Sequence, residues 1–216
     1  MERTQLSDDV ASRLRAEIMS GSLKPGSFIR LDDTAAQLGV SITPVREALL
    51  TLRGDGLVRL EPNRGYVVLP MTRQGIADIF WLQSTMAREL AASATARITD
   101  TEIDELGRIN ETLATTVESA DSDAVVAAEF AFHRAFNRVA GRIKLAWFLL
   151  HVARWMPPLL YAADPRWGAD AVDNHHRLIA ALRARDVEGA VEHTTWQFTD
   201  GALRLTGALE SSGIWD

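Results

Sequence analysis

A glutamate and two histidines have the residue types and spacing best suited to chemistry in this sequence. Glu129 and His133 lie four residues apart in a predicted helix at 123–140, so both side chains project from one face. His175 occupies an apolar stripe of another predicted helix at 169–184. A carboxylate or an imidazole is costly to bury without a partner, and both are ligands of divalent metals. The pattern predicts a buried polar cluster. By itself, each histidine is more typical of a hydrogen-bonded core residue than of a metal ligand.

The region that must position these residues is predicted to be helical. After Pro70 strand signals almost vanish, and helical segments alternate with breaks such as Gly141 and the stretch from Asp164-Pro165 through Gly168. The predicted helices cover residues 73–97, 101–119, 123–140, 142–162, 169–184 and 187–208. Short links between long helices favour an antiparallel bundle of about six helices. Pro157-Pro158 predict a kink or an early end in the fourth helix.

The first 70 residues show a different order of elements. The pattern predicts a helix at 5–20, a short extended piece after Pro25-Gly26, helices at 31–38 and up to Gly54, and β-rich runs at 57–60 and 66–69. Asp32 or Asp33 is expected to cap the second helix, and Ser41 or Thr43 the third. This order is typical of a winged helix-turn-helix. The fold class is therefore mainly α, with a winged helix-turn-helix domain at 1–70 and an all-helical bundle at 71–216.

Charge and composition exclude several further classes of function. The chain has 216 residues and a net charge of -6, but residues 1–72 hold nine basic and nine acidic side chains, so the acidity lies in the remainder. This balance argues against broad, charge-driven coating of nucleic acid. The absence of cysteine excludes disulfides, thiolate metal sites and a cysteine nucleophile. Without a signal sequence or an apolar run of ~20 residues, the expected location is the cytoplasm, with no membrane partner.

The N-terminal motifs resemble those of a known family. The run LGVSITPVREALLTLRGDGLV, and above all Pro44-Val45-Arg46-Glu47-Ala48-Leu49, resembles the DNA-binding module of GntR-family bacterial transcription regulators. The helical remainder resembles the FCD-type effector-binding domain of the FadR subfamily, and six helices point to its VanR-like branch. The resemblance implies a ligand-responsive regulator, a homodimeric repressor that binds double-stranded operator DNA and is released by a small organic acid.

The winged motif places candidate DNA contacts at the start of the recognition helix and at the wing tip. The candidates are Arg30, Ser41, Ile42, Thr43, Pro44, Arg46, Asn63, Arg64 and Gly65. The family usually has Arg at the positions of Ile42 and Asp32, so we expect an unusual operator or weaker binding. In the competing interpretations, Arg46 pairs with Glu47 or Asp55 on a solvated helix, and Arg64 is only a turn residue.

In many members of the subfamily an Asp-x3-His pair and two later histidines bind a divalent metal. The corresponding positions here hold Glu129, His133, His175 and Gln197, with His193 as a substitute for Gln197. Because the ligands are an unusual mixture, zinc is the first candidate and nickel the second. Glutamine is a weak ligand for either metal, so the alternative is a dismantled site.

The resemblance also implies an effector site around these residues. The expected effector-binding residues are Glu129, His133, Arg88, Trp147 and His175. Thr85 stands where the family often has an arginine that clamps the effector's anion, which favours a less charged effector.

Two other function classes remain open. A protein-interaction module with weak DNA binding would explain Asp32, Ile42 and the neutral N-terminal region. A metal-dependent hydrolase built on Glu129, His133 and His175 would leave the winged module unexplained, so we do not expect an enzyme.

Overall fold

The computed structural model describes residues 2–119, 121–153, 164–211, 213 and 215. The chain divides into two compact units, one formed by residues 1–75 with 207–216 and the other by residues 76–206. The boundary at residue 70 stays a prediction; in this division residues up to 75 belong to the first unit, and the C-terminal residues group with it instead of with the bundle.

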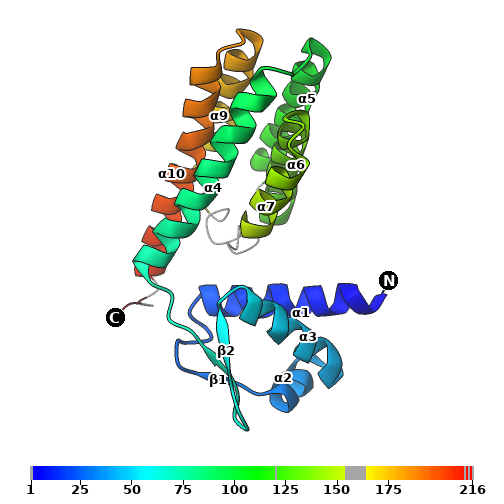
Figure 1. The fold of residues 1–216 in the computed structure, drawn as a ribbon, viewed down its shortest axis with the longest axis vertical. Helices are drawn as coiled ribbons and strands as arrows, with labels where there is room; N and C mark the ends of the chain where they lie inside the picture. The colour runs from blue at the N-terminus through cyan, green and yellow to red at the C-terminus, as the bar shows by residue number, and fades with distance from the viewer. Residues whose placement is uncertain (1, 120, 154–163, 212, 214, 216) are drawn as a thin grey trace. The chain divides into compact units, whose positions relative to one another are not determined.

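Three helices and a small sheet form the N-terminal part of the first unit (Figure 1). The elements are α1 (Glu2–Met19), β1 (Phe28–Ile29), α2 (Leu31–Leu38), α3 (Ile42–Gly54), β2 (Val58–Glu61) and β3 (Gly65–Val68). Gly39 ends α2 in the left-handed conformation (φ 68°), which glycine adopts at little cost. The predicted caps are wrong in part: the N-cap of α2 is Arg30, while Asp32 and Asp33 lie in the first turn. Ser41 is the N-cap of α3 but makes no side-chain capping bond.

The strands form an antiparallel sheet in the order β1-β3-β2, which makes the β2–β3 hairpin the wing. Gly65 begins β3 with φ 102°, and a Cβ there would lie 2.7 Å from the carbonyl oxygen of Ile29. Both the backbone conformation and the close approach of β1 therefore require glycine at this position.

The second unit is a helical bundle, and its described helices are α4, α5, α6, α7, α9 and α10, of which α4 and α10 extend into the first unit (Figure 1). Their bounds are α4 Arg73–Thr95, α5 Asp100–Glu118, α6 Ser122–Val139, α7 Ile143–Ala153, α9 Pro165–Arg183 and α10 Val187–Ser211. The mainly helical fold class is confirmed. Pro157-Pro158 and the second half of the predicted helix 142–162 lie outside the described residues, so the kink stays a prediction.

One predicted break is wrong. Asp164 and Pro165 do not interrupt the chain before a helix at 169, because Asp164 caps α9 and Pro165 occupies its first turn. Gly168 then lies inside the helix, where a Cβ would come within 2.6 Å of the Val117 side chain. This glycine lets α9 approach α5 closely.

The core of the bundle surrounds the predicted polar residues. Phe132 and Phe136 of α6 are fully buried together with Leu178 and Leu182 of α9. Helix α5 packs against both α6, which carries Glu129 and His133, and α9, which carries His175. Among the described helices, none is long and apolar enough to cross a membrane.

A capping box fixes the start of α5. The Thr99 hydroxyl accepts a hydrogen bond from the Glu102 backbone N–H, and the Glu102 carboxylate accepts one from the Thr99 N–H at 2.8 Å. That backbone hydrogen bond is the main reason why the pKa of Glu102 lies below its ordinary value.

We expect Thr99→Ala to lower the free energy of unfolding by about 1 kcal/mol, because it leaves the Glu102 backbone N–H without its acceptor. Urea titration followed by circular dichroism measures the change. Thr101→Ala, at an exposed position in the same turn, is the matched control. An equal loss in both variants would show that the capping box contributes nothing.

Candidate metal and effector site

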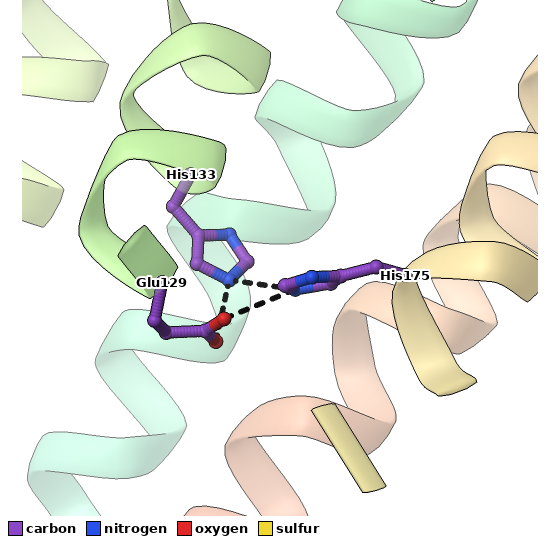
Figure 2. A group of neighbouring side chains, drawn as sticks. All are labelled: Glu129, His133 and His175. Carbon is purple, nitrogen blue, oxygen red and sulfur yellow. Dashed lines mark hydrogen bonds and ion pairs between the residues drawn. The ribbon is translucent and has the colours of Figure 1, made fainter. Parts of the chain in front are cut away.

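Glu129, His133 and His175 converge inside the bundle (Figure 2), as the spacing predicted for Glu129 and His133 and as the family resemblance implied for His175. Glu129 and His133 come from α6 and His175 comes from α9, and their ligand atoms all lie within 4.8 Å of one another. His133 Nε2 lies 3.0 Å from Glu129 Oε1 and 3.2 Å from His175 Nε2. His175 Nε2 lies 3.5 Å from Glu129 Oε2. Two imidazole nitrogens and both carboxylate oxygens therefore face one another.

Asn110 of α5 sets the orientation and tautomer of His175. The Asn110 Nδ2 donates to the Val172 carbonyl at 3.2 Å, which turns its Oδ1 toward His175 Nδ1 at 3.0 Å. Because that oxygen only accepts, the proton of His175 lies on Nδ1 and a lone pair lies on Nε2. Phe132 stacks on the other side of the ring, with centroids 3.6 Å apart and planes 10° apart. Sequence reasoning missed Asn110, which is a supporting residue of the kind that orients metal-binding histidines.

Electrostatics keep His175 neutral and Glu129 ionised. Burial lowers the pKa of His175 to about 4, although the Glu129 carboxylate opposes this shift. Burial by itself would raise the pKa of Glu129, but the imidazoles of His175 and His133 outweigh it and hold that pKa below its ordinary value. A neutral imidazole and a carboxylate are the protonation states in which these groups bind metals.

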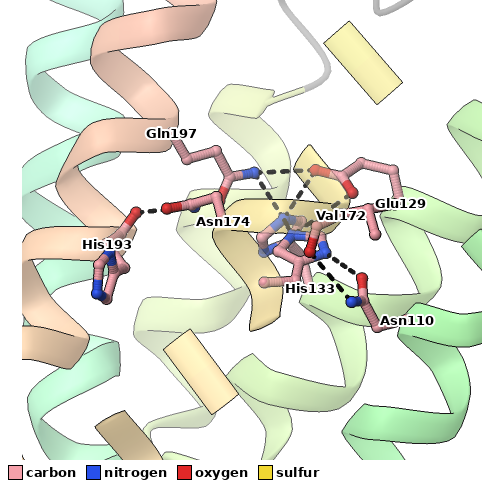
Figure 3. Close-up of polar contacts among 8 residues, drawn as sticks. Asn110, Glu129, His133, Val172, Asn174, His193 and Gln197 are labelled. Atoms are coloured by element: carbon pink, nitrogen blue, oxygen red, sulfur yellow. Dashed lines mark hydrogen bonds and ion pairs between the residues drawn. The ribbon is translucent and has the colours of Figure 1, made fainter. Parts of the chain in front are cut away.

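Gln197 of α10 faces the same point (Figure 3). Its Nε2 lies 2.6 Å from His133 Nε2 and 3.2 Å from Glu129 Oε1. The proposed substitute, His193, is not part of the cluster: its ring points away in Figure 3, and its backbone carbonyl accepts from Asn174 Nδ2 at 3.1 Å.

The donor set fits a divalent metal. Ligands at about 2.0–2.1 Å from a tetrahedral zinc lie roughly 3.3 Å apart, close to the separations between His133, His175 and Glu129. Glu129 Oε2 is buried and has no hydrogen-bond partner among the residues that the structure describes. A buried carboxylate oxygen of this kind is expected to be satisfied, and a cation among the three side chains would satisfy it.

A narrow cavity adjoins the cluster. Its lining residues are Glu129, Trp167, Ala171, Asn174, His175, Trp196, Gln197 and Asp200. Three predicted effector residues are absent from this lining. His133 belongs to the adjoining cluster, whereas Arg88 and Trp147 are exposed, Trp147 to 52%. Trp167 was missed because the start of α9 was mistaken for a break.

In the first unit, the predicted DNA contacts differ in exposure. Arg30, Ser41, Arg46, Asn63 and Arg64 are exposed, and Ile42 is 39% exposed. Pro44 is buried, so it offers the least surface to DNA. Asp55 pairs with Arg15 at 2.6 Å. The described residues record no carboxylate partner for Arg46, and Arg64 lies 5.4 Å from the Phe28 ring.

We expect Asn110→Leu to lower the free energy of unfolding by about 1–3 kcal/mol, because it leaves the buried His175 Nδ1–H without its acceptor. Chemical denaturation measures the change. Asn137→Ala, at a half-buried position of α6, is the control. An unchanged stability in Asn110→Leu would contradict the role assigned to Asn110.

Comparisons with known proteins cover both units. Residues 6–68 match the model described as bacterial regulatory proteins of the gntR family, and residues 78–196 match the FCD domain. The HTH-type transcriptional regulator McbR of Escherichia coli K12 is 28% identical over 193 residues, covering 88% of this chain and 87% of McbR. A probable D-xylose utilization operon transcriptional repressor of Paenarthrobacter nicotinovorans is 30% identical over 217 residues, covering 98% and 95%.

The solved structure of E. coli McbR/YncC has a TM-score of 0.71 and 27% identity, covering 94% of this chain and 97% of that one. Sequence and fold therefore agree along nearly the whole chain. The protein belongs to the GntR family of bacterial transcription regulators and carries an FCD domain after its DNA-binding module.

Proposed function

We propose that the protein is a homodimeric repressor that holds operator DNA in the cytoplasm and releases it when a small effector binds beside Glu129. The observation that carries the proposal is the presence, in one chain, of an exposed recognition helix and a buried cluster whose ligand atoms are not fully satisfied. Relatives that match most of the chain are named as transcriptional regulators or repressors, which supports this function over an enzyme.

The DNA contacts proposed are those of a winged helix-turn-helix. The N-terminal residues of α3 would meet base edges in the major groove, and the wing would lie along the adjacent groove. Arg46 suits a guanine or a phosphate, because its guanidinium is exposed and its helix neighbours do not neutralise it. Ile42 offers an apolar surface that suits a thymine methyl group instead of a phosphate.

A second copy of this chain is the proposed partner of the bundle. Large apolar side chains are exposed on two of its helices: Trp81 and Leu82 on α4, and Ile143, Trp147 and Phe148 on α7. Exposed aromatic surface of this kind is typical of interfaces. Two copies would present two recognition helices to the two halves of a palindromic operator.

Glu129, His133 and His175 would hold a divalent metal, zinc first and nickel second. Among the described residues that line the adjacent cavity, none is lysine or arginine. A bound metal would therefore supply the positive charge that an organic acid requires. Trp196 and Asn174 would contact the remainder of the effector.

Helix α10 offers a physical route from this site to the DNA-binding unit. It carries Gln197 in the second unit and ends in the first unit, where Glu210 pairs with Arg73 at 3.1 Å. The Arg73 guanidinium lies 4.3 Å from the Trp215 ring centroid, and the Trp215 indole N–H donates to the Met71 carbonyl at 2.6 Å. The C-terminal residues Glu210 and Trp215 thus contact the segment that joins the winged module to α4. An effector that moves α10 would shift the population of DNA-competent dimers.

We expect Arg46→Ala to weaken specific DNA binding by at least about tenfold, because each copy loses a contact of about 1–3 kcal/mol. The probe is a DNA fragment selected from a random pool by the unaltered protein, and binding is measured by fluorescence anisotropy at one fixed salt concentration.

Arg53→Ala is the matched control, because Arg53 is exposed in the last turn of the same helix. It should reduce binding only slightly. Equal affinities for the Arg46→Ala and unaltered proteins would contradict the assignment of α3. A random pool that yields no selected sequence would favour the protein-interaction alternative.

A further inference from the structure

The hydrogen-bond inventory of the cluster points to an unusual role for Gln197. The carboxylate oxygen Glu129 Oε1 can only accept, so the Gln197 group 3.2 Å from it must be the amide NH2 and not the amide oxygen. The same nitrogen lies 2.6 Å from His133 Nε2 and donates to it. With the amide nitrogen as the donor, His133 presents a lone pair at Nε2, so its 3.0 Å contact with the acceptor Glu129 Oε1 also lacks a proton.

Two lone pairs consequently face each other in the cluster. His175 Nε2 is unprotonated because Asn110 holds the proton of His175 at Nδ1. The 3.2 Å contact between His133 Nε2 and His175 Nε2 has no proton to share. The Gln197 amide thus satisfies His133 Nε2 and Glu129 Oε1. Among the described residues Glu129 Oε2 has no donor, and His175 Nε2 faces the lone pair of His133 Nε2.

We propose that the Gln197 NH2 group occupies the place of a cation in the metal-free protein and must leave before a metal can enter. The inference rests on the metal site proposed above and adds that Gln197 acts as a gate, a side chain that must move away before the metal can bind. A metal bound to His133 Nε2 would lie about 2.0–2.1 Å from that atom, within the space that the amide nitrogen fills. The amide and the metal therefore compete for the same two acceptor atoms.

If Gln197 competes with the metal, its removal has a different effect from the removal of a weak metal ligand. Gln197 stabilises the empty site, because its two N–H groups replace part of the charge that a metal would supply. Its removal should destabilise the metal-free protein and strengthen metal binding. Removal of an ordinary ligand would instead weaken metal binding and leave the empty site as stable as before.

The test compares four chelator-treated, full-length proteins: unaltered, Gln197→Ala, Gln197→His and His193→Ala. Zinc affinity is measured by competition with a chromophoric chelator, and the melting temperature is measured without metal. We expect Gln197→Ala to bind zinc about tenfold more tightly and to melt at a lower temperature without metal, since it loses hydrogen bonds to a charged group. Gln197→His should bind more tightly still, because it adds an imidazole ligand.

His193→Ala is the matched control, since His193 is half-buried on the same helix and its side chain lies outside the cluster. It should change neither quantity. Weaker zinc binding by Gln197→Ala would identify Gln197 as a ligand and overturn the gate, and an unchanged affinity would overturn it as well. If Gln197→His also failed to bind zinc, the metal site itself would be wrong, and the gate with it.

Discussion

A buried carboxylate that faces two unprotonated imidazole nitrogens is the constraint on which the rest of this structure depends. Glu129 Oε2 and His175 Nε2 lie 3.5 Å apart without a donor between them, in the core of a helical bundle. Such an arrangement is costly unless a cation or a donor approaches it. Three contacts hold the cluster in place. Asn110 fixes the tautomer of His175, the Phe132 ring stacks on His175, and the Gln197 amide donates to His133.

Four helices must meet with the correct faces for these contacts to form. Helix α5 supplies Asn110, α6 supplies Glu129 and His133, α9 supplies His175, and α10 supplies Gln197. The close packing of α9 on α5 at Gly168 and the capping box at Thr99 help to fix the helix that carries Asn110. Helix α10 carries Gln197 and continues to Glu210, which pairs with Arg73, and the Arg73 guanidinium also lies beside the Trp215 ring.

Sequence periodicity was sufficient for most of the helices and for the Glu129–His133 pair. The place of His175 in the cluster was implied by the family resemblance, and the surroundings of the cluster were not predicted. Glu129 and His133 share a face because they are four residues apart, so their proximity follows from helix geometry. Asn110 and His175 are 65 residues apart, and their contact depends on how α5 packs against α9, which periodicity does not determine. Arg88 and Trp147 were chosen by residue type as effector contacts, but their helices turn these side chains outward. A proline near the start of α9 was taken as a break, although proline is favoured in a first helical turn.

Elemental analysis of the purified, untagged protein tests the central claim, that this cluster is a metal site, most directly. After incubation with excess zinc and removal of unbound metal, we expect about one zinc per chain in the unaltered protein. That metal should be lost in His133→Ala and in His175→Ala but retained in His193→Ala. No bound metal in the unaltered protein, or equal amounts in all four proteins, would contradict the claim.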